Sequence, residues 1–83
     1  MKISDIPDRA VCIAYAEFAK NRPSAGGRFP YQILMSMFDA PFKVAYAACE
    51  RAARRDLVEY GVSLRTGWLT DKGLVILEGK DGK

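Results

Sequence analysis

The stretch that decides the fold is residues 39–61, DAPFKVAYAACERAARRDLVEYG. Asp39 is a residue type that caps helices and Pro41 suits a first helical turn, so we predict a helix over about residues 41–55. The segment is rich in alanine, the strongest helix former. Small side chains at helical spacing give it one narrow face that can lie close against another element: Ala45, Ala48, Cys49 and Ala52.

A shorter helix is predicted directly before this one, beginning at Pro30 and ending at the break Asp39-Ala40-Pro41. Its apolar residues repeat at helical spacing: Ile33, Leu34, Met37 and Phe38. We interpret Met35 and Met37 as core filling, because flexible methionine side chains commonly fill gaps in a core. Two helices joined by a short turn form a helix-turn-helix unit, here over about residues 30–55.

The first part of the chain predicts another helix. Asp5 is placed to cap it, Pro7 suits its first turn, and Asp8 complements the helix dipole. Residues at helical spacing then form one apolar face: Val11, Ala14, Tyr15 and Phe18. Residues 21–27 end this helix, because Pro23 forbids its continuation and two glycines follow.

After Asp56 the pattern changes to a short β-hairpin over about residues 57–69, with Trp68 expected to pin it to the body. A last short helix is predicted from Thr70-Asp71-Lys72, with an inner side made of Leu74, Val75 and Leu77. A hairpin directly after a helix-turn-helix makes the unit winged. We therefore predict a mainly α (α+β) fold in one domain over residues 1–83: a three-helix core, a short wing and a short C-terminal helix.

Residues 52–61, AARRDLVEYG, followed by residues 68–74, WLTDKGL, resemble the end of winged helix-turn-helix domains of the MarR and PadR types. Residues 59–68 are also similar to small winged-helix proteins encoded by phages and prophages. Asp56 stands where many members have glycine before Leu-Val, so this turn is expected to differ in backbone geometry. The resemblance implies a DNA-binding protein, such as a transcriptional regulator of phage, prophage or bacterial origin.

Composition excludes several classes of function. Among 83 residues there is no histidine, which rules out imidazole metal sites and Ser-His-Asp or Cys-His catalysis within this chain. Cys12 and Cys49 alone make neither a disulfide framework nor a zinc site, and we interpret both as small core residues. No catalytic motif is recognisable, so we expect neither an enzyme nor a cofactor or metal.

No apolar run reaches the roughly 20 residues that cross a bilayer, and the N-terminus lacks the pattern of a signal peptide. We therefore expect a cytoplasmic protein without a membrane partner.

The positive charge gathers in one segment of the chain. Of the formal net charge of +3, residues 1–40 contribute +1, residues 41–55 contribute +3 and residues 56–83 contribute −1. The excess therefore falls on the helix that this fold offers to DNA, and double-stranded DNA is the expected partner. The total is small, so specific binding is expected to need a homodimer or a partner protein.

In a helix-turn-helix the second helix enters the major groove, where its N-terminal residues meet base edges. On this basis Lys43 is predicted to donate to guanine or to a phosphate, beside Tyr46 and Ala47. Tyr46 reaches a phosphate or packs against a thymine methyl group in this interpretation. Further along, Arg51 and Arg54 are predicted to contact the DNA backbone.

Two other regions complete the predicted interface. Arg65 at the wing tip is expected to reach a minor groove or a phosphate. Arg28 and Tyr31, near the start of the shorter helix, are expected to hold another phosphate.

Each of these assignments has an alternative. The arginines of residues 51–55 suit a solvated helix end, where basic residues offset the dipole, and Tyr46 suits the edge of a core. The alternative function is a winged-helix protein-interaction module without specific DNA binding, for example a phage factor that binds and inhibits a host protein. Exposed side chains of Phe42 and Tyr46, a short wing, and Glu50 within the DNA-facing side of the helix favour this alternative.

Overall fold

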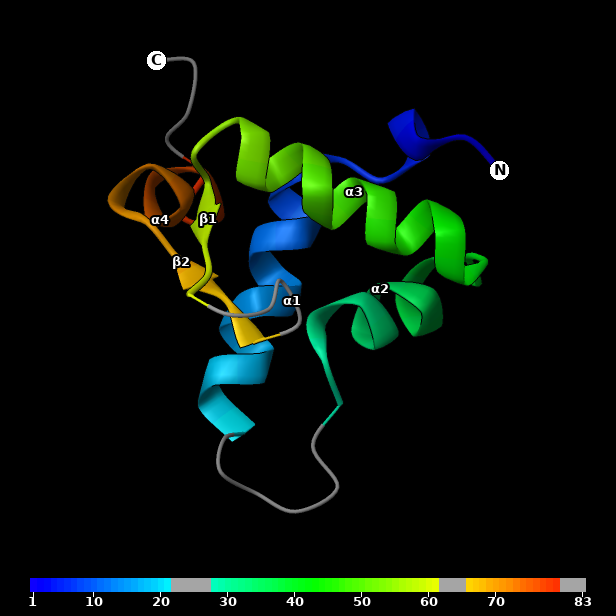
Figure 1. The fold of residues 1–83 in the computed structure, drawn as a ribbon, viewed down its shortest axis with the longest axis horizontal. Helices are drawn as coiled ribbons and strands as arrows, with labels where there is room; N and C mark the ends of the chain where they lie inside the picture. Colours follow the sequence, from blue (N-terminus) through cyan, green and yellow to red (C-terminus); the bar gives the residue numbers. More distant parts are fainter. Residues whose placement is uncertain (22–27, 62–65, 80–83) are drawn as a thin grey trace.

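The computed structural model describes residues 1–21, 28–61 and 66–79, so Arg65 lies outside the described residues. The elements follow in the predicted order, from helices to a hairpin to a last helix (Figure 1). A 3-10 turn η1 (Ile3–Asp5) comes first, followed by α1 (Asp8–Asn21), α2 (Pro30–Phe38), α3 (Phe42–Arg54), β1 (Val58–Glu59), β2 (Trp68–Leu69) and α4 (Asp71–Leu77). The predicted combination of a mainly helical chain with one small antiparallel hairpin is confirmed.

Helix α1 is the central element, because α2, α3, α4 and β2 all contact it. Its predicted apolar face is confirmed: Val11, Ala14, Tyr15 and Phe18 are all buried. The prediction that Asp5 caps this helix is wrong. Asp5 belongs to η1, where its carboxylate accepts a hydrogen bond from the backbone N–H of Lys2 at 3.0 Å. The helix itself begins after Pro7, with Asp8 in its first turn.

Helix α2 begins at Pro30 as predicted, and the Phe29 N–H before it donates to Oε1 of Gln32 at 2.9 Å. The helix ends at Asp39, whose φ of 52° is left-handed. The prediction that Asp39 caps the next helix is wrong, because Pro41 occupies the N-cap of α3. Asp39 instead ends α2, in a conformation that short polar side chains tolerate better than most residues.

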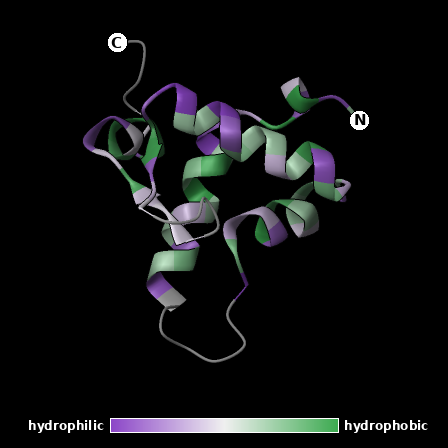
Figure 2. Cartoon of the chain, viewed as in Figure 1, coloured by the Kyte–Doolittle hydropathy of each residue, from purple (hydrophilic) through white to green (hydrophobic). Residues whose placement is uncertain are grey.

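Helix α3 crosses the top of the molecule in Figure 1 and packs against α1, α2 and η1. Its predicted face of small side chains is confirmed in full: Ala45, Ala48, Cys49 and Ala52 are its buried residues. Figure 2 shows hydrophilic residues toward both ends of α3 and more apolar ones between. The fully buried face of α3 is thus made of small side chains, and Val44, Tyr46 and Ala53 beside it pack partly against the core.

The hairpin contacts the end of α3 through β1, and α4 packs against α1 and β2. Val58 pairs with Leu69 and Glu59 with Trp68 in antiparallel register. The predicted helix start at Thr70 is confirmed, because its side chain accepts a hydrogen bond from the Gly73 N–H at 3.1 Å.

The sequence prediction for the inner side of α4 is wrong at two of three residues. Leu74 and Val75 are 43% and 44% exposed, while Gly73 is buried and Ile76 and Leu77 pack against the core. The helix therefore turns its glycine toward β1, and this rotation carries Leu74 and Val75 outward.

Two further packing predictions differ from the structure. Trp68 is 46% exposed, because successive strand residues face opposite sides and Leu69 takes the inner one. Trp68 therefore shares the outer face with its exposed partner Glu59. Met37, in the last turn of α2, is 47% exposed, so the prediction that it fills the core is wrong.

Candidate nucleic-acid interface on α3

The outward face of α3 lies opposite its buried alanines. Lys43, Glu50 and Arg54 are exposed on it, and Ala47 is half-buried between them. A rise of 1.5 Å per residue places Lys43 and Arg54 about 16 Å apart along the helix axis. The face thus carries two separated positive charges with one negative charge between them.

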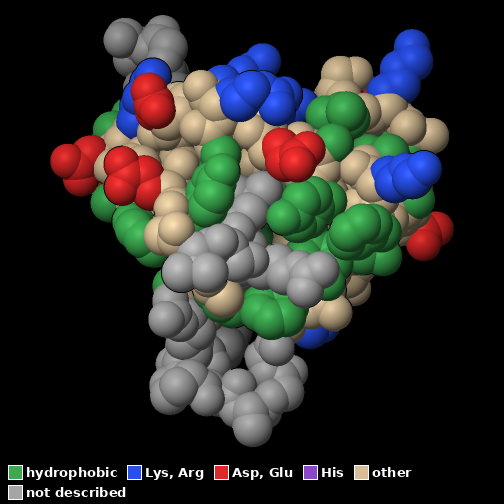
Figure 3. All heavy atoms as spheres, in the orientation of Figure 1, with side chains coloured by type: hydrophobic (Ala, Val, Ile, Leu, Met, Phe, Trp, Pro, Cys, Tyr) green, Lys and Arg blue, Asp and Glu red, His purple; other side chains and the backbone are tan. Residues whose placement is uncertain are grey.

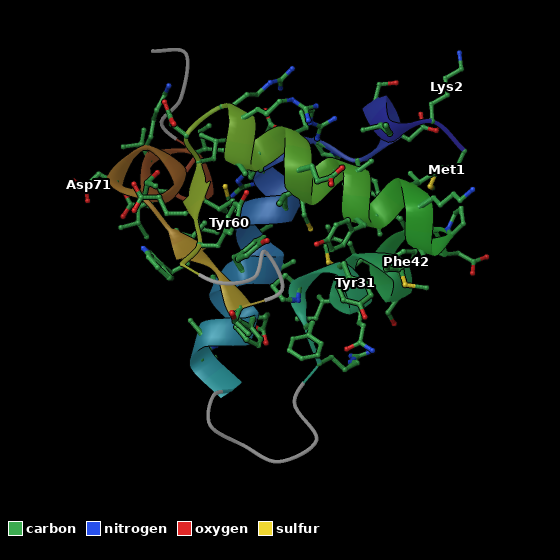
Figure 4. The ribbon with its side chains drawn as sticks, in the orientation of Figure 1. Met1, Lys2, Tyr31, Phe42, Tyr60 and Asp71 are labelled. Atoms are coloured by element: carbon green, nitrogen blue, oxygen red, sulfur yellow. The ribbon has the colours of Figure 1, made fainter. Side chains whose placement is uncertain are left out.

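One edge of this face is aromatic. The ring of Tyr31 on α2 meets Phe42 edge-on, with centroids 5.2 Å apart, and Tyr46 in the same way at 5.8 Å. Phe42 and Tyr46, one turn apart on α3, stack at 5.5 Å. Figure 4 shows Tyr31 and Phe42 close together where α2 and α3 meet. The rings hold the N-terminal half of α3 against α2.

Two more rings extend this arrangement into the protein. Phe29 stacks on Tyr31 at 6.2 Å, and Phe18 at the end of α1 meets Phe29 at 5.9 Å. We call these five residues the aromatic cluster: Phe18, Phe29, Tyr31, Phe42 and Tyr46. It runs from Phe18, which is 8% exposed, to Phe42, which is 44% exposed. Figure 3 shows hydrophobic side chains gathered over α2 and α3, with charged side chains around them.

Sequence reasoning did not find the cluster as a unit. The spacing of Phe42 and Tyr46 by one helical turn is a local signal for one of its contacts. The rings of Phe18 and Phe29 join the cluster through the packing of α1 against α2, which no local pattern specifies.

Arg51 does not lie on the outward face where the sequence prediction placed it. Its side chain is 14% exposed, and its Nε donates to Oδ1 of Asp8 at 2.9 Å. Its two other nitrogens donate to backbone carbonyls, Nη1 to Ile3 at 3.1 Å and Nη2 to Ile6. Arg51 therefore ties the N-terminal turn to α3, and its donors are taken by acceptors of the protein itself.

The carboxylate of Asp8 also binds a second arginine. Nη1 of Arg55 donates to Oδ2 of Asp8 at 2.5 Å, so each carboxylate oxygen accepts from a different guanidinium. One acidic residue of α1 thus offsets two of the four basic residues of the segment 41–55.

The other described residues that the sequence predicts for the DNA interface lie on or beside α2 and α3. Tyr31 and Tyr46 meet in the aromatic cluster, and Lys43 and Ala47 share the outward face of α3. Arg54 is exposed at the C-terminal end of α3, and Arg28 is exposed just before α2.

Beneath the interface lies a buried pair of groups that stays neutral. Tyr15 of α1 and Cys49 of α3 are hydrogen-bonded to each other. Burial raises the pKa of the Cys49 thiol to about 12, and burial also raises the pKa of Tyr15. Burial, with a smaller effect of the Asp8 charge, raises the pKa of Cys12 to about 11. Both cysteines are core residues as predicted, and a thiol held protonated is a poor nucleophile.

An open hollow of about 450 Å³ lies between the hairpin and α4. It is lined by Asp56, Glu59, Leu69, Thr70, Asp71 and Lys72. The carboxylates that dominate this lining repel phosphate, so the hollow is not suited to DNA. Within residues 1–21, 28–61 and 66–79, no group of three or more acidic or cysteine side chains is placed to hold a metal ion.

Among the described helices, none combines the length and the apolar character needed to cross a membrane. Comparison of the chain with protein-family models, with curated proteins and with solved structures gave no match. The function is therefore argued from the geometry and chemistry of the α3 face.

Proposed function

We propose that this chain is a small winged-helix DNA-binding protein, acting as a regulator of transcription, and that it reads the major groove with α3. The observation that carries the proposal is the placement of α3. It buries only alanine and cysteine side chains, follows α2 through a tight turn, and turns Lys43 and Arg54 to solvent. The second helix of a helix-turn-helix enters the major groove with its exposed face, and α3 takes the place of that helix in this proposal.

The dimensions of α3 suit this role. Its 13 residues correspond to about 20 Å of helix. The major groove of B-DNA is about 12 Å wide and admits one α-helix. The N-terminal half of such a helix meets base edges, which assigns base contact to Lys43 and Ala47 and backbone contact to Arg54.

Neighbouring elements supply additional contacts in this proposal. Arg28, which is exposed just before α2, holds a phosphate through its guanidinium. The hairpin directly follows α3 and contacts it through β1, so it takes the place of the wing.

The electrostatic part of the binding energy is modest. Glu50 lies on the outward face between Lys43 and Arg54, and two arginines of the same helix region are bound to Asp8. We therefore expect weak, salt-sensitive binding by one copy of the chain.

The test is a fluorescence anisotropy titration with a labelled mixed-sequence duplex at several salt concentrations. Arg54→Ala is expected to weaken binding and to reduce the slope of log K against log salt by about 0.9, while Lys43→Ala is expected to weaken binding mainly through the lost base contact. Lys72→Ala is the matched control, because it removes the same charge from exposed α4. Equal slopes for all three variants and the wild type contradict the proposal.

A second candidate function is a protein-interaction module, and the exposure of Phe42 favours it. A phenylalanine ring that is 44% exposed beside the half-buried rings of Tyr31 and Tyr46 is typical of protein contacts. The same titration separates the two functions. A protein-interaction module binds no duplex at any salt concentration, and its Phe42→Ser variant loses a protein partner, either a host protein or a second copy of the chain.

A further inference from the structure

The N-terminal half of α3 offers little polar chemistry to base edges. Its outward and flanking side chains are Phe42, Lys43, Tyr46 and Ala47. Lys43 has a charged donor and Tyr46 a hydroxyl, while Phe42 and Ala47 have no hydrogen-bonding atoms in their side chains. A base-reading surface with this composition works mainly through apolar contact.

The apolar part of this surface is held in place before any DNA arrives. Phe42 and Tyr46 stack on each other with their ring planes 26° apart. Both meet Tyr31 nearly at right angles, at 85° and 75°. Because these contacts fix the rings, binding costs little of the side-chain entropy that a free aromatic residue would lose. Phe42, at 44% exposure, keeps the most area available for a partner.

The major groove contains one apolar group, the C5-methyl group of thymine. The polar groups that distinguish the base pairs there are hydrogen-bond donors or acceptors, and covering one of them with a phenyl ring leaves it unpaired. An apolar surface at the N-terminus of a groove-reading helix is therefore complementary to thymine.

We infer that Phe42, held by Tyr31 and Tyr46, reads thymine methyl groups, so that the preferred duplex has thymine next to a guanine that faces Lys43. This inference rests on the proposed function and adds the sequence class of the DNA. Phe42 and Lys43 are consecutive residues in the first turn of α3, so in a helix that lies in the groove both stand over the same short stretch of base pairs.

The experiment begins by enriching a random duplex pool on the wild-type protein. The enriched duplex is then compared with one in which deoxyuridine replaces the thymines of the contacted positions, a change that removes only the methyl groups. Affinity is expected to fall about fourfold for each methyl group that the protein covers. The control duplex carries deoxyuridine outside the contacted positions and is expected to bind as tightly as the unmodified one.

Variants assign the effect to a residue. Phe42→Ala is expected to bind the thymine and deoxyuridine duplexes equally, while Lys43→Ala binds both more weakly and keeps the difference between them. Phe42→Leu, which retains an apolar side chain, is expected to keep part of the difference. Circular dichroism melting of each variant shows that it is folded in the titration.

Two outcomes overturn the inference in distinguishable ways. Duplex binding without thymine enrichment, or with no effect of deoxyuridine, overturns the thymine readout and leaves DNA binding in place. Absence of any duplex enrichment overturns DNA binding as well, and the exposed ring of Phe42 then belongs to a protein contact.

Discussion

Arg51 is a charged residue whose side chain stabilises the fold instead of lying exposed on the surface. Three acceptors surround its guanidinium, namely one oxygen of Asp8 and the carbonyls of Ile3 and Ile6. These bonds join the start of the chain to α3. Arg51, which the sequence pattern predicts to contact the DNA backbone, is therefore a structural link between the N-terminal segment and α3.

Arg51→Met tests this link, because methionine retains most of the apolar stem and removes the guanidinium. Hydrogen bonds to charged groups contribute about 1.5–3 kcal/mol each, and the partial exposure of this site places the expected loss of unfolding free energy at about 1–3 kcal/mol. Urea unfolding measures it. Arg54→Met is the matched control on the same helix, with an expected change within about 0.5 kcal/mol. Equal midpoints for the two variants would contradict the structural role of Arg51.

The two buried thiols predict how stability responds to alkaline pH. Their pKa rises from 9.0 to about 11 for Cys12 and about 12 for Cys49, chiefly because burial disfavours the thiolate. The unfolded chain therefore releases these protons from about pH 9 upward, while the folded chain still holds them. Unfolding thus becomes more favourable as pH rises, and their contribution to stability is intact below pH 9.

Between pH 9 and 11 each thiol is expected to lower the unfolding free energy by up to about 1.4 kcal/mol per pH unit. Urea unfolding at a series of pH values measures the slope. The double variant Cys12→Ala/Cys49→Ala retains every tyrosine and lysine, so it is the control for their titration. A double variant with the same slope as the wild type would show that the thiols are not protected by burial.

At the scale of elements, α4 is seated on the hairpin through a glycine. A Cβ atom at Gly73 would lie 2.1 Å from the carbonyl oxygen of Leu57. The same region is closed by hydrogen bonds from Thr70, whose N–H donates to Leu57 and whose hydroxyl donates to the carbonyl of Asp56. The missing side chain therefore sets how near the helix comes to β1.

Gly73→Ala reverses the usual effect of this substitution. In an exposed helix interior alanine is more stable than glycine by about 1 kcal/mol, but here the methyl group collides with backbone. We expect a net loss of about 1–3 kcal/mol, in the range of overpacked cores, measured by thermal unfolding. Gly61→Ala is the control, because the nearest atom to its Cβ is 4.0 Å away. A Gly73→Ala protein with raised stability would mean that α4 lies further from the hairpin.

The elements that sequence predicted well are those decided by neighbours along the chain. The small face of α3 and the start of α2 at Pro30 follow from local spacing and from the fixed φ of proline. The destination of Arg51 does not, because its acidic partner lies 43 residues away. The rotation of α4 was missed for the same reason, since the clash that would arise at Gly73 involves a different element.

Asp56 is an intermediate case between local and tertiary information. The resemblance to winged-helix domains places it where glycine is common, and a different turn geometry was expected. Its φ of 64° is left-handed, which is the conformation that glycine adopts most readily. Asp56 therefore adopts a left-handed backbone in this turn, which short polar side chains tolerate better than most residues.

For the whole molecule, the formal net charge of +3 is larger than the positive charge that the outward face of α3 presents to solvent. Asp8 binds Arg51 and Arg55, so within residues 28–61 the proposed interface keeps Arg28, Lys43 and Arg54 as its exposed cations outside this ion-pair network. Of these, Arg28 and Arg54 are assigned to phosphates, and two phosphate contacts imply a roughly 12-fold loss of affinity between 50 and 200 mM salt. The slope of log K against log salt, measured by anisotropy for the wild type, therefore reports how many cations are free to contact phosphates while Asp8 holds Arg51 and Arg55.

Asp8→Asn changes the number of cations that are free to contact phosphates, and it leaves every residue on the outward face of α3 unchanged. Asparagine keeps the shape of the side chain but loses the charge that holds Arg55, whose side chain is already 58% exposed. Arg55 is then free to meet a phosphate, and the slope of log K against log salt is expected to steepen by about 0.9. Asp71→Asn on α4 makes the same change in net charge and is expected to leave the slope as it is. If both variants steepen the slope equally, the effect belongs to the overall charge. If only Asp8→Asn does, the carboxylate of Asp8 limits how strongly the whole molecule binds DNA.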